Sequence, residues 1–312
     1  MQYDMSRTTL FEVSWEVCNK VGGIYAVVSS KALEAAALFG DNYYLLGPDL
    51  GNNAEFEETD EACWQELRAI TARRNLACRF GRWDIPGRPK VILVGYRDRF
   101  NQGQLLFSLW NRYGIDSISG GWDYVEPVMF STACGEVIEA ACQTLAVPAS
   151  GPVLAHFHEW MCGGGLLYLK ERAPKLGTVF TTHATMLGRS MAGSGFIYKQ
   201  MNQINPKMEA GAYNITAKCS METASAREAD CFTTVSRITA DEATVFLGRS
   251  PDVVTPNGLD MRVIPDYSAE RDVPAGARAK LLGAAGRLLR RELAPDTRIF
   301  IISGRYEYHN KG

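Results

Sequence analysis

Segments with the pattern of buried β-strands alternate with segments of helical periodicity along most of this chain of 312 residues. Strands that are separated by helices pair in parallel and are covered by helices on both faces. The alternation therefore predicts the α/β fold class, with a Rossmann-like parallel sheet flanked by helices. The predicted strands are residues 8–14, 42–46, 91–96, 153–156, 177–181, 231–235, 253–255 and 298–303, and the predicted helices are residues 23–39, 125–145, 163–170, 206–230, 237–246 and 277–292.

Composition and charge exclude several classes of protein. The 33 basic and 35 acidic residues are well mixed and give a net charge of −2, which predicts neither a nucleic-acid partner nor a membrane partner. We find no secretory signal and no apolar run of about 18 residues, so no membrane span is expected. The eight cysteines include no CxxC pair, and we interpret them as reduced, mostly buried thiols of a cytoplasmic protein.

The segment FEVSWEVCNKVGGIY, residues 11–25, joins an apolar strand to a helix through a Lys-x-Gly-Gly turn. Gly22 and Gly23 would let a ligand approach the first free N–H groups of the helix, where the dipole favours negative charge. Lys20 adds a full positive charge. The pattern indicates an anion site, although an ordinary Gly-Gly turn uses the same residues. The fingerprints GxGxxG and GxxxxGK[ST] are both absent, which disfavours an NAD-linked oxidoreductase.

Two of the four histidines lie where the strand 153–156 ends, in the sequence HFHEW. His156 and His158 are two residues apart and share a face, a spacing that metal sites use. Zinc requires three or four ligands, and the other candidate ligands are scattered, so no metal is predicted. Two interpretations remain. The histidines are hydrogen-bonded at a strand end, or they line a polar sugar pocket in which Glu159 accepts a hydrogen bond from a hydroxyl group of the sugar.

The next strand leads into TTHATMLGR, which places His183 at the neighbouring strand end. A neutral imidazole can donate to one hydroxyl group and accept from another, and Arg189 could bind a phosphate through two hydrogen bonds. Alternatively, the threonines of this segment only begin a helix and Arg189 is solvated.

The last two strand ends also carry polar residues. Asn257 lies in the turn PNGLD, where a role in the turn and a contact with a ligand are equally compatible with the pattern. Arg305 and Lys311 are six residues apart in GRYEYHNKG, so both cations could bind one diphosphate, or the loop could simply be solvated.

Six motifs in this order resemble the glycogen synthases of the eukaryotic type, which are retaining glycosyltransferases of glycosyltransferase family 3 with the two-domain GT-B fold. The resemblance covers residues 7–312 with gaps, chiefly 51–88 and 261–295. The motifs are FEVSWEVCNKVGGIY, HFHEW, TTHAT with LGR, FTTVSRIT, VTPNGLD and GRYEYHNKG.

The resemblance implies a role for each matching residue. The residues implied to bind the donor or its diphosphate are Lys20, Gly22, Gly23, Arg189, Arg305 and Lys311. Those implied to act in catalysis are His183 at the transferred glucose, Glu159 in the sugar pocket, and again Arg305 and Lys311 at the leaving diphosphate. His158 and Asn257 are implied to lie on the acceptor side.

The implied reaction transfers glucose with retention from a nucleotide-glucose donor, UDP-glucose, to the 4-hydroxyl at the non-reducing end of an α-1,4-glucan such as glycogen. Negative charge builds on the departing diphosphate, so cations aimed at it would assist the reaction. No metal and no cofactor are expected. The resemblance is compatible with a homo-oligomer, but it specifies no number of copies.

The resemblance also predicts a domain organisation. Residues 1–296 would form the N-terminal, acceptor-side domain of the GT-B architecture. Residues 297–312 would form the first strand and loop of a truncated C-terminal domain that binds the nucleotide sugar. We therefore expect this chain to be inactive by itself, and full activity of the 312-residue chain would contradict that expectation.

Other functions remain open from the sequence. A retaining GT-B enzyme related to sucrose synthase or trehalose-phosphate synthase would share these strand ends, and product analysis would distinguish it. A non-catalytic half-protein that binds glucan would bind maltooligosaccharide without the donor. The choice between UDP-glucose and ADP-glucose is unresolved, as is regulation by glucose 6-phosphate, because the segment after PNGL carries no cluster of His, Gln and Lys.

Overall fold

The computed structural model describes residues 5–53, 55–143, 151–194, 198–258 and 272–301. The chain divides into two compact units, residues 1–258 and residues 259–312, and each is described by itself. The second unit contains helix α10 (Asp272–Leu289). The predicted domain boundary at residue 296 stays a prediction.

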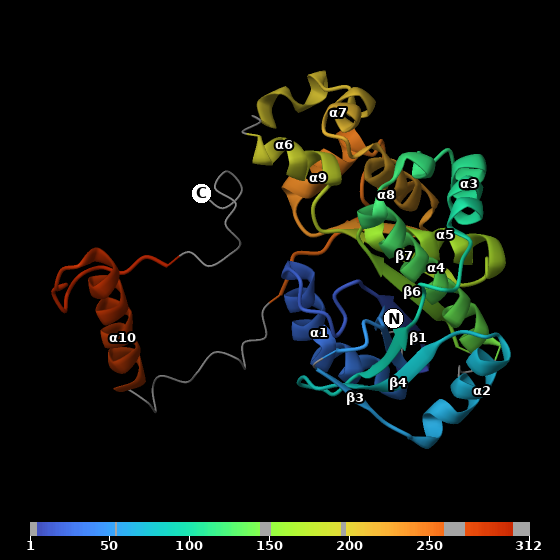
Figure 1. Cartoon of the computed structure of the whole chain (residues 1–312), viewed down its shortest axis with the longest axis horizontal. Coiled ribbons are helices and arrows are strands. Elements are labelled where there is room, and N and C mark those ends of the chain that lie inside the picture. Colours follow the sequence, from blue (N-terminus) through green and yellow to red (C-terminus); the bar gives the residue numbers. More distant parts are fainter. Residues whose placement is uncertain (1–4, 54, 144–150, 195–197, 259–271, 302–312) are drawn as a thin grey trace. The chain divides into compact units, whose positions relative to one another are not determined.

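The first unit is built on one sheet. Its described strands are β1 (Thr9–Val13), β2 (Tyr43–Pro48), β3 (Phe56–Glu58), β4 (Cys78–Trp83), β5 (Lys90–Val94), β6 (Val153–His158), β7 (Gly177–Thr182), β8 (Cys231–Thr234) and β9 (Val253–Val254). They lie in the order β3-β4-β5-β2-β1-β6-β7-β8-β9 (Figure 1). Every pair between β5 and β9 is parallel, which confirms the predicted parallel sheet for this part.

The sheet is nevertheless mixed, because β3 and β4 add antiparallel pairs beside β5. Sequence analysis missed both strands. In β3 the side chains are half-buried or exposed, so its sequence lacks the apolar run of a central strand. The predicted strand at 298–303 is wrong for residues 298–301, which are described and have no strand structure. Its other residues lie outside the described part of the chain.

Helices connect the strands. Those described in the first unit are α1 (Gly23–Phe39), α2 (Gln65–Arg73), α3 (Gln102–Tyr113), α4 (Trp122–Cys142), α5 (Gly163–Arg172), α6 (Met186–Gly193), α7 (Pro206–Ala212), α8 (Thr216–Glu228) and α9 (Arg237–Phe246). The predicted bounds of α1 and α9 are confirmed. The single helix predicted at 206–230 is wrong, because Asn214 has a φ of 54° and separates α7 from α8.

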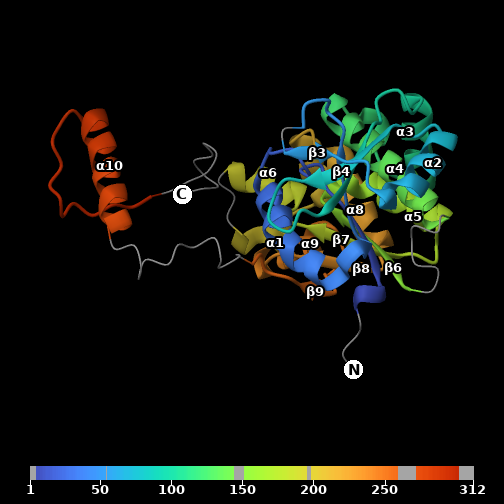
Figure 2. The same cartoon turned by 90° about the horizontal axis from the view of Figure 1, so that it is seen from below.

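Alternate side chains of the strands enter two cores, one on each face of the sheet. Phe11, Tyr44 and Leu46 pack into the larger core with residues of α4 and α5. Tyr43 and Leu45 point the other way and pack with residues of α1. Figure 2 shows α1 on one side of the sheet and α2, α4 and α5 on the other. Helices therefore cover both faces, as predicted.

Two further expectations concern membranes and cysteines. Within the described residues, none of the helices combines the length and the apolar character that crossing a membrane requires. All eight cysteines are free, as predicted. The prediction that they are mostly buried is wrong, because only Cys18, Cys134 and Cys162 are buried and Cys142 is exposed.

Candidate functional site

The path of the chain across the sheet changes direction between β1 and β6. The parallel strands β2 and β5 follow β1 on one side, whereas β6, β7, β8 and β9 extend the sheet on the other. In open α/β sheets, ligands bind outside the carboxyl ends of the strands at such a switch point. Here the loops that follow β1, β6 and β7 leave neighbouring strands (Figure 1).

The amino end of α1 holds a carboxylate of the chain itself. Glu16 Oε2 accepts hydrogen bonds from the backbone N–H groups of Gly22, at 2.8 Å, and Tyr25, at 2.7 Å. A Cβ atom on Gly22 would lie 3.0 Å from Glu16 Oε1, whereas one on Gly23 would meet no described atom within 4 Å. The exposed Lys20 lies with its ammonium 5.1 Å from the centre of the Tyr25 ring. The helix end binds a negative group, as its dipole favours, but sequence analysis missed that this group is Glu16.

Glu159 follows β6 and holds the loop that carries His183. Its Oε1 accepts from the backbone N–H groups of His183, at 2.8 Å, and Ala184, at 3.1 Å. The residue is buried and has a φ of 67°, a left-handed conformation that is uncommon outside glycine and is concentrated at functional sites. Glu159 therefore supports the backbone of the loop, and its predicted contact with a sugar stays a prediction.

The carboxyl of Glu159 titrates in an unusual range. Burial raises its pKa to about 7 against the opposing effect of the N–H groups of His183 and Ala184, and the charge of Glu16 raises it further. Glu16 also binds the amino end of α1, so this interaction links the loop after β1 with the loop that carries His183.

The raised pKa of Glu159 predicts that the protein loses stability between pH 5 and pH 7. The unfolded carboxyl loses its proton near 4.5 while the folded one keeps it to about 7, so the free energy of unfolding falls as pH rises. We expect Glu159→Gln, which keeps an acceptor for both N–H groups, to remove about 2 kcal/mol of this fall. Urea unfolding at both pH values measures it. The exposed Glu66→Gln is the control. If the free energy of unfolding falls equally between pH 5 and pH 7 in the wild type and in Glu159→Gln, the prediction is contradicted.

Two more buried carboxyls hold the start of α6. Glu222 Oε2 accepts from the N–H of Met186 at 2.9 Å, and Glu242 Oε2 accepts from the hydroxyl of Thr185 at 2.7 Å. Burial and the neighbouring charge of Glu159 raise the pKa of Glu222 well above its usual range. Sequence analysis missed both residues. In α8 the signal was available, because small residues surround Glu222 and indicate a buried helix face.

A hydrogen-bonded chain of buried and half-buried polar groups lies at the ends of β1, β6 and β7. Glu12 Oε1 is 2.6 Å from His158 Nε2 and 2.5 Å from the ammonium of Lys31 in α1. His158 Nδ1 is in turn 2.9 Å from His183 Nε2. The register explains the convergence, since Glu12 pairs with His156 across β1 and β6 and His158 points to the same face. The predicted site residues His158 and His183 are therefore in direct contact.

The same cluster resembles a metal site in its spacing. Glu12, His156 and His158 offer ligand atoms within 4.8 Å of one another. However, the ammonium of Lys31 already lies 2.5 Å from Glu12 Oε1, and its charge would repel a divalent cation. His156 Nε2 is also engaged, at 2.7 Å from the hydroxyl of Thr181. This candidate cation site is empty, and no metal is assigned to it.

Lys31 is predicted to stabilise the fold through Glu12. Burial alone would raise the pKa of the Glu12 carboxyl, but Lys31 and His158 lower it well below its usual 4.5. Lys31→Met should cost about 2 kcal/mol at pH 7, less than for a wholly buried pair because the Lys31 side chain is 36% exposed. The difference from wild type should shrink below pH 4.5, where the unfolded Glu12 keeps its proton.

Chemical denaturation at pH 7 and pH 4 checks the prediction for Lys31. The matched control is Lys170→Met, which removes a contact to the half-exposed Asp230 and should cost under about 1 kcal/mol. A Lys31→Met protein as stable as the control at pH 7 would contradict the account of Glu12.

The remaining predicted site residues lie elsewhere. Arg189 is exposed in the first turn of α6, near His183 in sequence. Asn257 is exposed after β9, which β8 separates from β7, so Asn257 lies farther along the sheet than the cluster. Arg305 and Lys311 lie outside the described residues. The structure thus brings together His158, Glu159 and His183 through the contacts above. Gly22 contacts Glu16 at the start of α1, and Asn257 is not brought to these residues.

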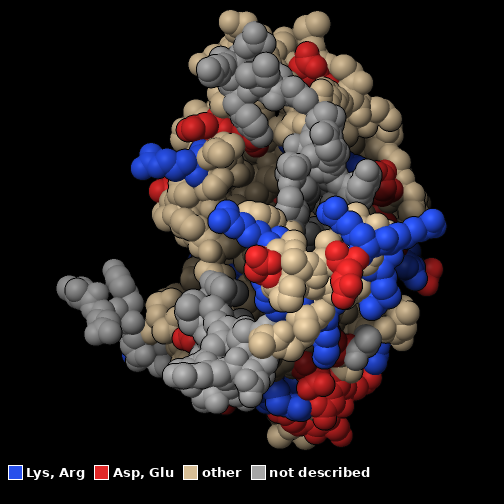
Figure 3. Space-filling view, turned by 90° about the vertical axis from the view of Figure 1, so that its left-hand side faces the viewer, with Lys and Arg blue, Asp and Glu red and all other residues tan. Residues whose placement is uncertain are grey.

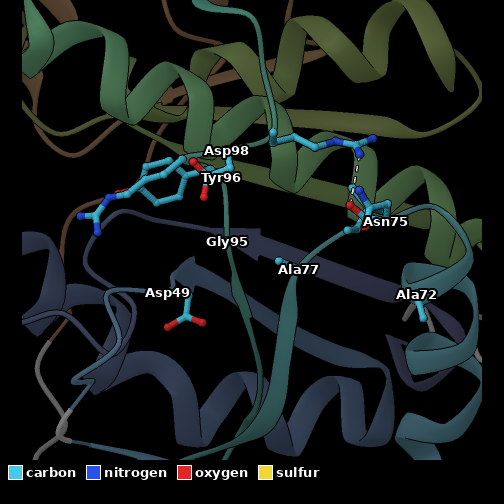
Figure 4. Close-up of a pocket in the computed structure, with 10 residues that line it drawn as sticks. Asp49, Ala72, Asn75, Ala77, Gly95, Tyr96 and Asp98 are labelled. Atoms are coloured by element: carbon cyan, nitrogen blue, oxygen red, sulfur yellow. Dashed lines mark hydrogen bonds between the residues drawn. The ribbon is translucent and has the colours of Figure 1, made fainter.

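A separate pocket of about 620 Å³ opens beside the ends of β2 and β5 (Figure 4). Arg99 donates to the carbonyl oxygen of Asn75 at 3.1 Å and to Glu136 at 2.8 Å, so it is committed within the protein. Sequence analysis predicted no site there, and the contacts of Arg99 favour no ligand class. The residues that line the pocket are Asp49, Ala72, Asn75, Leu76, Ala77, Gly95, Tyr96, Arg97, Asp98 and Arg99.

The charges on the surface agree with the composition. On the face drawn in Figure 3, Lys and Arg side chains lie next to Asp and Glu side chains. Among the described residues, ion pairs include Arg82 with Glu61 at 2.6 Å and Arg99 with Glu136 at 2.8 Å. This face therefore presents both signs of charge.

The sheet and the cluster at its switch point define a doubly wound α/β protein with a polar site at the carboxyl ends of parallel strands. The chain belongs to the glycogen synthase family, whose sequence profile matches residues 12–312. It is 36% identical to the liver glycogen [starch] synthase of Rattus norvegicus over 97% of this chain and 44% of that protein. It is 34% identical to isoform 2 of the Saccharomyces cerevisiae glycogen [starch] synthase, over 100% of this chain and 46% of that protein.

The chain thus spans slightly less than half the length of the curated relatives it matches. Among solved structures, the catalytic domain of Starch Synthase IV from Arabidopsis thaliana bound to ADP and acarbose gives a TM-score of 0.43. That likeness has 12% sequence identity and covers 82% of this chain and 52% of the other.

Proposed function

We propose that this chain forms the acceptor-side half of a glycogen synthase, which transfers glucose with retention from UDP-glucose to the 4-hydroxyl at the non-reducing end of an α-1,4-glucan. The reaction takes place in the cytoplasm and uses no metal and no cofactor. Membership of the glycogen synthase family supports the reaction. The observation that carries the location is the contact network at the switch point, in which Glu159 holds the backbone of His183 while Glu16 holds the start of α1.

In this proposal the diphosphate of the donor lies at the amino end of α1, and the glucose lies at His183. The N–H groups of the first helical turn would stabilise negative charge as it develops on the diphosphate. Glu16 occupies two of these N–H groups, so the donor must displace its carboxylate or bind beside it. Lys20, Arg305 and Lys311 supply the positive charge, and Arg189 extends the donor site.

The contacts of Glu16 predict that it competes with the donor. Glu16→Gln removes a negative charge beside the proposed diphosphate and should strengthen UDP binding about fivefold, or ~1 kcal/mol. Lys20→Gln should weaken binding by a similar factor. Calorimetry with UDP measures both. Glu34→Gln, which changes a carboxyl later in α1, is the control, and weaker UDP binding by Glu16→Gln would contradict the competition.

Glucosyl transfer to glycogen tests the function. The assay uses radiolabelled UDP-glucose with a protein of the relatives' full length that contains this chain, and digestion of the product identifies the new linkage. The proposal predicts α-1,4-linked glucose on glycogen. Transfer to fructose or to glucose 6-phosphate would instead favour the sucrose or trehalose-phosphate synthase class, and glucan binding without transfer would favour a non-catalytic protein.

A further inference from the structure

The chain of hydrogen bonds from Glu12 to His183 has a direction. Glu12 is completely buried, and its two oxygens receive three contacts: Lys31 at 2.5 Å and His158 at 2.6 Å on Oε1, and the hydroxyl of Tyr43 at 2.6 Å on Oε2. The ammonium and the hydroxyl both donate. A carboxylate with such neighbours keeps its charge and acts only as an acceptor.

The charge of Glu12 fixes the proton of the next group. Since Glu12 Oε1 can only accept, the short contact to His158 requires a proton on His158 Nε2. The opposite arrangement would place two lone pairs 2.6 Å apart. Burial lowers the pKa of His158, so the ring is neutral and carries no second proton. His158 Nδ1 is therefore an acceptor.

His158 in turn fixes the proton of His183. Its Nε2 lies 2.9 Å from His158 Nδ1, which has no proton to donate, so His183 Nε2 must carry the proton of this bond. Burial also lowers the pKa of His183 to about 3, which leaves a single proton on the ring. His183 Nδ1 is then left with a free lone pair, on a side chain that is only partly buried.

We propose that Glu12 is a positioning residue that acts through His158 to hold His183 in the Nε2–H tautomer, so that Nδ1 presents a hydrogen-bond acceptor to a hydroxyl group of the ligand. The tautomer follows from the contacts once both imidazole rings are neutral. The hydroxyl ligand rests on the proposed function, in which the glucose lies at His183. Glu12 itself touches no ligand in this proposal.

Nitrogen-15 spectra of the 312-residue chain with labelled histidine test the assignment, because protonated and unprotonated ring nitrogens resonate far apart. The chain has only four histidines, so the signals can be assigned by substituting them one at a time. In the wild type we expect protons on Nε2 of both His158 and His183. A proton on Nδ1 of His183 in the wild type would overturn the proposal, and this measurement needs no variant to fold.

The variant Glu12→Leu tests whether Glu12 is the cause. It removes the acceptor that faces His158 Nε2, so either ring nitrogen of His158 can carry the proton, and His183 should lose its single tautomer and show both forms. Full retention of the Nε2–H form would overturn the role of Glu12. Glu139→Leu is the matched control, since Glu139 is also buried and accepts from Tyr168 at 2.7 Å, while its contacts among the described residues include no histidine.

These spectra are independent of catalysis. If the tautomers are as expected and glucosyl transfer is absent, the positioning role stands and the proposed function fails. If transfer is found and His183 carries its proton on Nδ1, the proposed function stands and the role of Glu12 fails.

Discussion

Gly165→Ala should destabilise the protein by at least about 2 kcal/mol. A Cβ atom at this position would lie 2.2 Å from the carbonyl oxygen of Ser131 and 2.9 Å from the ring of Phe157. The first of these atoms belongs to the backbone of α4 and cannot rotate away. Overpacking of this kind costs about 3 kcal/mol, and the better helix propensity of alanine returns only about 1.

The cost should come from space and not from backbone conformation. Gly165 lies within α5 and is absent from the residues with positive φ. The matched control is Gly211→Ala in α7, where a Cβ atom would meet no described atom within 4 Å. It should leave stability unchanged or raise it by about 0.5 to 1 kcal/mol. Urea unfolding midpoints compare the two, and a Gly165→Ala protein as stable as the control would refute the close packing of α4 on α5.

His183→Ala should lower glucosyl transfer by about 10²- to 10³-fold, or roughly 3 to 4 kcal/mol of transition-state stabilisation. In the proposed function His183 lies at the transferred glucose, and the alanine variant removes the ring nitrogen that would contact it. The backbone of the loop should stay in place, because Glu159 binds the N–H groups of residues 183 and 184 and not the imidazole.

Initial rates with UDP-glucose and glycogen measure this loss in a protein of the relatives' full length that contains this chain. Thermal unfolding of each variant separates a catalytic defect from a folding defect. The control is Ile238→Ala in α9, which changes a side chain that is 62% exposed. A loss of less than about tenfold in a folded His183→Ala protein would contradict the assignment of His183.

The fold could largely be predicted because its signals are local. The apolar run of β1 and the helical periodicity of α1 required no knowledge of distant contacts, and the order of elements implied a parallel sheet. Helix α3 was missed although its signals were present. Asn101 accepts from the N–H of Gln104 at 3.0 Å at its start, and Gly114 has a φ of 68° at its end.

The site could be predicted only in part. The motifs located His158, Glu159 and His183 at neighbouring strand ends, and the structure brings these residues into contact. The roles of Glu12 and Lys31 could not be recognised from the sequence. They depend on the packing of α1 against β1, which brings the Lys31 ammonium within 2.5 Å of Glu12 Oε1. In the sequence, Glu12 is the single charged residue of a mostly apolar strand.

Glu16 illustrates a second limit. The sequence predicts that the amino end of α1 is open to an external anion, because Gly22 and Lys20 are typical of such sites. A carboxylate six residues before Gly22 can fold back onto the same N–H groups at 2.8 Å. Spacing alone does not decide between an internal and an external anion, since both satisfy the same unpaired donors.

A crystal structure of the complex with UDP-glucose tests the central claim most directly, using a protein of full length that contains this chain. The account predicts the diphosphate at the N–H groups of Gly22 and Gly23, with the Glu16 carboxylate displaced or beside it, and the glucose in contact with His183. Donor density away from the carboxyl ends of β1, β6 and β7, with Glu16 still bound at the start of α1 and no ligand near His183, would contradict it.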